Sequence, residues 1–193
     1  MKDQKFVRAP AAVMKLVNQL VAENHPEIKE AKLTFDLCFC HAEKDENGDP
    51  TGPAIMHRGA QAAGVARITS LKERAMGRAD AEISIDGDRW EDWTAETRLA
   101  LLDHEIYHFI PKKDQLGHVK RDDLGRPQLT MRQHDYQFGW FTEIARRHGA
   151  ASFEVQQAEL MNKQAGQVLF PFMRAAFKQA GEKSSSAKAA TAG

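Results

Sequence analysis

The chain has 193 residues, 42% of them hydrophobic, and its 27 lysine plus arginine residues balance its 27 aspartate plus glutamate residues. This length and composition support one domain with one hydrophobic core, and the neutral charge argues against nucleic-acid binding through bulk positive charge. No apolar run is long enough for a transmembrane helix, and the polar N-terminal segment does not resemble a secretory signal, so we expect a cytoplasmic protein.

The first ninety residues contain one predicted helix and a set of short strands. Apolar residues recur at helical spacing over residues 10–24, and the alternation of apolar and polar residues that follows is typical of strands. These strands are expected over residues 31–41, 54–56, 64–69 and 79–86. Cys38 and Cys40 lie on the same face of the first strand, which is poor geometry for a disulfide, so we interpret them as buried free thiols.

Residues 93–109 are predicted to form a buried helix. Thr94 is a suitable N-cap residue, a run of leucine and alanine residues favours helix, and Pro111 cannot continue one. Because a proline also disfavours helical geometry in the residue before it, the helix should end just after His108.

This helix contains the sequence His-Glu-x-x-His at positions 104–108. Positions i and i+4 lie on the same face of a helix, so His104 and His108 can direct two imidazoles at one metal ion, with Glu105 beside them. Two histidine ligands and a glutamate that activates water are the pattern of zinc peptidases. The alternative is a chance spacing of two core histidines, which is the weaker interpretation for ionisable residues on so apolar a helix.

A long polar loop and two further helices are expected after the motif helix. The loop covers residues 111–133 and includes a tight turn at 123–127. An amphipathic helix should begin at His134 and end before Gly149, and another should cover residues 152–170. The expected organisation is therefore a domain over residues 1–150, a helical extension over 151–180 and a disordered tail over 181–193.

A catalytic zinc site needs three protein ligands and one open position. The metzincin pattern is excluded, because proline and aspartate replace its glycine and its third histidine. The remaining downstream candidates are His118, Asp122, Asp123, His134 and Asp135. We favour His134, which begins the predicted amphipathic helix, and interpret Asp135 as an acceptor behind a ligand imidazole. His118 is expected to be solvated, His25 to be a surface or capping residue, and His148 to have a structural role at a helix end.

Several segments carry a resemblance to a known family. They are residues 25–35, 79–90, 93–108 and 132–149. The chain resembles the putative phage metallopeptidase family over roughly residues 13–150, and its His-Asp-x-x-Phe sequence at 134–138 is similar to that of SprT-like metalloproteases. The resemblance implies a zincin-like α+β fold, in which a small twisted sheet of three to four strands packs on the HExxH helix, with a second ligand-bearing helix and a C-terminal helix. It also implies that His104, His108 and His134 are zinc ligands and that Glu105 is the catalytic residue.

The expected function is zinc-dependent hydrolysis of a peptide or protein substrate, with Glu105 as the general base, by a phage- or prophage-encoded protein in the bacterial cytoplasm. By analogy with zincins, the small residues of 56–68 are expected to provide an edge strand that binds the substrate backbone. The alternative is a catalytically idle zincin-like protein that binds a host or phage partner, with a structural or regulatory metal and a fourth ligand such as His118 or Asp123. We expect no membrane partner, and a nucleic-acid partner is disfavoured.

Overall fold

The computed structural model describes residues 4–134 and 141–165. The chain divides into two compact units, Met1–Glu154 and Val155–Gly193, and the structure describes only residues 155–165 of the second. The tail expected over 181–193, and the larger part of the extension expected over 151–180, lie outside the described residues.

Short strands and helices follow one another along the first unit. The strands are β1 (Phe6–Arg8), β2 (Phe35–Cys40), β3 (Met56–His57), β4 (Ala60–Gln61), β5 (Gly64–Ile68), β6 (Ala81–Asp86), β7 (Phe109–Pro111) and β8 (Leu129–Met131). The helices are α1 (Ala11–Asn24), α2 (Pro26–Ala31), α3 (Leu71–Ala75), α4 (Ala95–Tyr107), α5 (Thr142–His148) and α6 (Phe153–Ala165), with 3-10 turns η1 (Trp90–Asp92) and η2 (Gly149–Ala151). The described chain is thus mixed α+β, as the sequence predicts, and no helix within it has the length and apolarity to cross a membrane.

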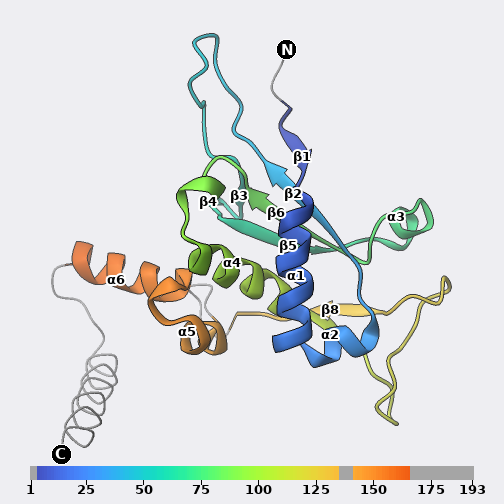
Figure 1. Ribbon diagram of the computed structural model, residues 1–193. Helices are drawn as coiled ribbons and strands as arrows, with labels where there is room; N and C mark the ends of the chain where they lie inside the picture. Colours follow the sequence, from blue (N-terminus) through green and yellow to red (C-terminus); the bar gives the residue numbers. More distant parts are fainter. Residues whose placement is uncertain (1–3, 135–140, 166–193) are drawn as a thin grey trace, which may run out of the picture. The chain divides into compact units, whose positions relative to one another are not determined.

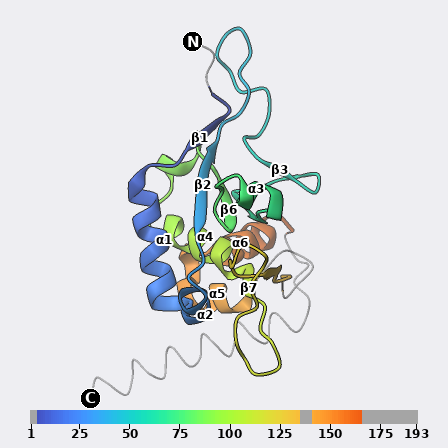
Figure 2. The ribbon, with the colours of Figure 1, turned by 90° about the vertical axis from the view of Figure 1, so that its right-hand side faces the viewer.

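A four-stranded sheet in the order β1-β2-β6-β5 is the centre of the fold (Figures 1 and 2). Strands β2 and β6 are parallel, whereas β1 and β5 pair antiparallel with their neighbours. The register places Leu37 beside Ile83 and Phe39 beside Ile85, so the apolar side chains of the two central strands share one face. Strand β5 is left as an edge of the sheet, next to α4.

Helices α1 and α4 cover the apolar face of the sheet. The core that joins them includes Val17 and Leu20 of α1, Leu102 and Ile106 of α4, and Ile83 of β6. Each fully buried side chain of this kind contributes roughly 1.5–3 kcal/mol relative to exposure, so packing fixes the position of α4 against the sheet. Any ionisable side chain on α4 is therefore held at a defined place in the interior.

Two short helices are absent from the sequence prediction although both carry a start signal. Helix α2 begins at Pro26, and the strand predicted from residue 31 begins only at Phe35. Helix α3 follows Ser70, whose side chain accepts the amide N–H of Glu73, while the Glu73 carboxylate accepts the amide N–H of Ser70. A proline at the first helical position and a Ser-x-x-Glu capping box are both readable from sequence.

The helix predicted from His134 begins later than expected. His134 lies in irregular backbone after β8, residues 135–140 lie outside the described chain, and α5 begins at Thr142. The prediction that His134 sits on a helix is therefore wrong. The reason is the antiparallel pairing of β7 with β8. The Arg132 amide extends this pairing by donating to the His108 carbonyl at 2.6 Å, which keeps the backbone before His134 extended.

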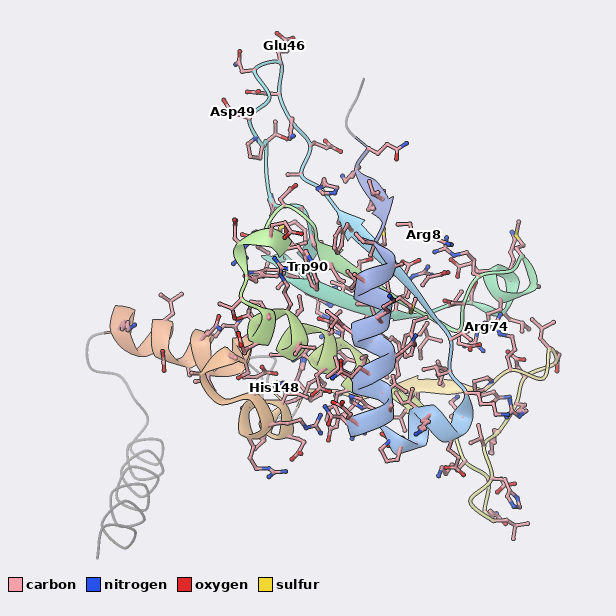
Figure 3. All side chains as sticks on the ribbon, viewed as in Figure 1. Arg8, Glu46, Asp49, Arg74, Trp90 and His148 are labelled. Carbon is pink, nitrogen blue, oxygen red and sulfur yellow. The ribbon has the colours of Figure 1, made fainter. Side chains whose placement is uncertain are left out.

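The polar loop between β7 and β8 contains two tight turns of the same geometry. Asp114 and Asp122 each accept, through Oδ1, the amide N–H groups two and four residues ahead. Short carboxylate side chains favour such turns because they hydrogen-bond their own following backbone. Arg74 of α3, labelled in Figure 3, holds the second turn. Its Nη1 donates to Asp122 Oδ2 at 2.9 Å and to the Pro127 carbonyl at 3.0 Å.

Asp103 of α4 is a fully buried charge that joins three helices. Its carboxylate accepts Nη1 of Arg147 at 2.7 Å, and lies 2.5 Å from Nε2 of His25 and 2.6 Å from Nε2 of His148. Burial alone would raise the pKa of Asp103, but these hydrogen bonds outweigh burial and hold the pKa well below its usual range. His25 is 1% exposed, so the surface position is wrong, but His25 is the cap residue between α1 and α2, which is the other alternative of that prediction.

Replacing Asp103 with asparagine should destabilise the protein by about 3–5 kcal/mol, because Arg147 and two imidazoles lose a buried counter-charge. Urea unfolding at neutral pH measures the change, with the exposed Asp123→Asn as the matched control. Because the folded-state pKa is depressed, this stabilisation is present above the unfolded pKa of about 4 and is lost as the pH falls toward the folded-state value. An Asp103→Asn variant as stable as the control would contradict the assignment.

Candidate metal centre

The last turns of α4 present two imidazoles on one face of the helix. At the start of α4 the Thr94 side chain accepts the Thr97 amide N–H at 3.2 Å, and the helix ends at Tyr107 with His108 as its C-cap residue, both as the sequence predicts. The i, i+4 spacing brings the ring centroids of His104 and His108 to 5.2 Å.

His134 completes a group of three histidines. Its ring centroid lies 5.2 Å from that of His104 and 4.7 Å from that of His108, and its Nε2 lies 3.2 Å from Nε2 of His104. One nitrogen of each ring lies within 4.8 Å of the corresponding nitrogens of the other two. Within residues 4–134 and 141–165, this is the group of histidine, cysteine or acidic side chains with the spacing of a metal site.

Contacts behind the rings decide which nitrogen faces the centre. Nδ1 of His104 lies 2.6 Å from Oε1 of Glu154, and Nδ1 of His108 lies 2.9 Å from the carbonyl oxygen of Arg132. Both partners are acceptors, so both imidazoles carry their proton on Nδ1 and leave Nε2 with a lone pair. Such acceptors behind metal-binding histidines fix the tautomer and the ring orientation.

Arg132 attaches the segment that bears His134 to the end of α4. Its amide and carbonyl both bond to His108, its Nε donates to the Tyr107 carbonyl at 3.0 Å, and its guanidinium lies 4.2 Å from the centre of the Tyr107 ring. The guanidinium thereby satisfies a carbonyl at the helix C-terminus, where a positive charge is favourable. Since His134 follows only two residues later, these contacts also fix the position of the third imidazole.

Phe141 packs against all three imidazoles from the buried side. Its ring centroid lies 4.7 Å from those of His104, His108 and His134. Phe141 is fully buried, whereas the histidines keep partial exposure, so the phenyl ring supports the triad from the interior. A packed aromatic ring restricts the rotation of the three side chains without competing for a ligand.

The side chain of Glu105 is 4% exposed and lies between its own helix, α4, and the edge strand β5. Burial raises the pKa of its carboxyl to about 7, the charge of Glu154 adds to the rise, and His104 and a hydrogen bond from the Ala66 backbone oppose it. A buried carboxyl whose pKa lies near neutrality can both take and release a proton, which is the property required of a general acid and base.

Gly64 leaves the space that Glu105 occupies. A Cβ atom added at Gly64 would lie 2.8 Å from Oε1 of Glu105 and 3.1 Å from its Cγ and Cδ. These distances are shorter than a carbon atom can approach without displacing its neighbour. The carboxylate of Glu105 therefore leaves no room for a side chain at Gly64, the first residue of β5.

The environments of the two helix histidines differ. The pKa of His108 is lowered to about 3. Burial is the largest cause, the neighbouring imidazoles act in the same direction, and the hydrogen bond to Arg132 opposes them. Burial also disfavours charge on His104, but the hydrogen bond to Glu154 and the charges of Glu105 and Glu154 outweigh it and raise the pKa. His108 is therefore neutral, which is the state that a metal-binding imidazole requires.

Four of the predicted site residues lie together: His104, Glu105, His108 and His134. His118 is instead exposed in the first turn of the loop, 3.6 Å from Asp114. Asp135, expected behind a ligand imidazole, lies outside the described residues. Glu154 and Arg132 fill the supporting positions among the residues that are described.

The supporting residues Glu154, Arg132, Phe141 and Gly64 were not predicted. Glu154 lies beyond the region assigned to the domain, and nothing in its local sequence points to His104. Phe141 lies within the predicted amphipathic helix and Gly64 within the predicted edge segment 56–68, so for these two only the contact with the site lies beyond the sequence prediction.

The comparison with protein families agrees with this geometry. The profile of a family described as "Putative phage metallopeptidase" matches residues 4–164. The match spans well over half of the chain, so the chain belongs to this family. No curated protein and no solved structure matches it. The family implies a metal ion, and the three histidines are a group able to hold one.

Replacing His134 with alanine should weaken zinc binding by more than the ~10–100-fold that loss of an outer contact typically causes, because a ligand itself is removed. Competition with a chromophoric chelator measures the affinity. His118→Ala, which removes an exposed imidazole from the neighbouring loop, is the matched control and should bind as the wild type does. Equal zinc affinity for the two variants would overturn the choice of His134.

Proposed function

We propose that this member of the phage metallopeptidase family is a zinc-dependent peptidase, with His104, His108 and His134 as the zinc ligands and Glu105 as the general base. The observation that carries the proposal is the convergence of three imidazoles with a buried carboxyl beside them. Each alone has a structural explanation, but a structural brace does not need one nitrogen of each of three rings within 4.8 Å of the other two.

The donor set fits zinc. Neutral imidazole nitrogens suit this borderline-soft cation, and three protein ligands with an open position are typical of catalytic rather than structural zinc sites. Bound there, zinc would supply Lewis acidity that polarises a substrate carbonyl and makes a neighbouring water acidic. The acceptors behind His104 and His108, and the phenyl ring of Phe141, would hold the ligands in place beforehand.

Glu105 would transfer the proton during hydrolysis. As a carboxylate it accepts a proton from the attacking water, and as a carboxylic acid it delivers that proton to the leaving amine. A pKa near 7 allows both forms to be reached at neutral pH. The Ala66 amide and the space left by Gly64 would keep the carboxyl in one orientation.

Strand β5 would hold the substrate. Ala63 and Thr69 bond to β6 through the Asp86 amide and the Asp80 carbonyl, so the alternating register directs the backbone groups of Gly64, Ala66 and Ile68 away from the sheet. An extended peptide could pair with such an edge while its scissile bond lies next to Glu105. A zincin-like arrangement, with the HExxH helix beside an edge strand, is part of this proposal, as is action in the cytoplasm of a bacterial host.

The second candidate is an idle protein with a structural metal that binds a partner. It requires a fourth protein ligand that closes the site. Across the described residues neither His118 nor Asp123 joins the three histidines. The ligand count therefore favours the peptidase.

Replacing Glu105 with glutamine should leave zinc binding intact and lower hydrolysis of an unfolded protein substrate by about 10²–10⁴-fold, because the amide cannot accept the proton. Zinc content by elemental analysis and cleavage of denatured casein are measured together. Glu96→Gln, an exposed glutamate in the first turn of the same helix, is the control. Undiminished cleavage by a zinc-loaded Glu105→Gln protein would refute the role of Glu105.

Replacing Gly64 with alanine should lower kcat about a hundredfold while zinc affinity is retained, because a displacement of Glu105 by about 1 Å is enough to misalign the base. Steady-state cleavage of the same substrate gives kcat and KM separately. Gly52→Ala is the matched control, since a Cβ atom there meets nothing within 4 Å. Equal kcat for the two alanine variants would show that the close contact at Gly64 does not position Glu105.

A further inference from the structure

Glu154, the second residue of α6, places a carboxylate in the interior behind the triad. It is 2% exposed, and its Oε1 lies 2.6 Å from Nδ1 of His104. The same oxygen accepts the Phe141 amide N–H at 3.5 Å. Both neighbours belong to the site, so Glu154 contacts the ligand assembly from behind.

The other oxygen of Glu154 has no hydrogen-bond partner among the described residues. Oε2 is buried and meets no hydrogen-bond donor within the described part of the chain. No lysine or arginine among the described residues pairs with Glu154, whose ion pair is with His104. An isolated buried carboxylate is strongly unfavourable, so its retention calls for a compensating positive charge. The route by which such compensation can reach it is the imidazole of His104.

Comparison with Asp103 separates a brace from a positioning residue. The Asp103 carboxylate receives donors from Asn24, His25, Arg147 and His148, which satisfy both of its oxygens. A carboxylate kept to hold helices together is expected to be saturated in this way. Glu154 is instead half satisfied, and its one short contact is to a metal-ligand candidate.

We propose that Glu154 is the positioning residue of the metal centre, which holds His104 with its proton on Nδ1 and its Nε2 toward the metal. This inference rests on the metal site of the proposed function. The carboxylate makes the imidazole a stronger ligand and compensates part of the charge of a bound dication. The first turn of α6 therefore contributes to the site through Glu154. This turn is also held by Phe153, whose ring centroid lies 5.4 Å from that of Trp93.

Glu154→Gln is the direct test, because it keeps the shape of the side chain and removes the charge. Zinc affinity, measured by chelator competition, should fall about 10–100-fold, and Glu154→Asp should recover part of the loss. Glu159→Gln, an exposed glutamate on the same helix, should bind as the wild type does. Zinc affinity of Glu154→Gln equal to that of Glu159→Gln would overturn the proposal.

Urea unfolding of the metal-free proteins excludes a merely structural role. Glu154→Gln should be at least as stable as the wild type, because an amide replaces a half-satisfied buried carboxylate. The result that would contradict positioning is a metal-free variant that is less stable than the wild type, while the molecules that remain folded bind zinc as tightly as the wild type does.

Imidazole nitrogen NMR of the wild type keeps the proposal testable if the variant does not fold. His104 should carry its proton on Nδ1, hydrogen-bonded to Glu154, both with and without zinc. A His104 protonated on Nε2 would overturn the inference. Zinc binding without hydrolysis would defeat the proposed peptidase and leave this inference standing, whereas equal zinc binding by wild type and Glu154→Gln would do the reverse.

Discussion

The structure depends on burying a helix that carries ionisable side chains. Helix α4 must pack beside α1 against the sheet to close the core, yet residues 103–108 bring an aspartate, a glutamate and two histidines with it. Without partners, such groups would be strongly destabilising in the interior. The partners come from distant parts of the chain: α1 and α5 for Asp103, α6 for His104 and β5 for Glu105. The elements around α4 are those that make its burial possible.

Two adjacent residues of this helix are satisfied in different ways. Asp103 is saturated by donors within the protein, which is the condition for a stable brace. His104 is satisfied on Nδ1 by Glu154, while its Nε2 lies 3.2 Å from Nε2 of His134. One nitrogen of each of His104, His108 and His134 lies within 4.8 Å of the other two, which is a spacing that could hold a metal ion. The same turn of helix is thus structural on one side and chemical on the other.

Local patterns in the sequence were sufficient for α1, β2, β6 and α4, because periodicity, an N-cap and a proline stop act within a few residues of where they appear. The pair His104 and His108 follows from helix geometry alone. Glu154 lies fifty positions from His104, and its role depends on how α6 packs, which no local pattern encodes. The capping box at Ser70 was readable and overlooked, whereas the tight fit of Gly64 against Glu105 is visible only in three dimensions.

His134, the proposed third ligand, is positioned without regular secondary structure. The sequence prediction places His134 at the start of a helix, but the structure places it in irregular backbone. Rigidity comes instead from the contacts of Arg132 with the end of α4. Its guanidinium contacts the Tyr107 carbonyl and ring, its amide donates to the His108 carbonyl, and its carbonyl accepts from His108 Nδ1. These bonds also satisfy carbonyls that a helix C-terminus leaves without partners. Arg132 both caps α4 and positions the third imidazole, so the end of the motif helix itself determines where His134 lies.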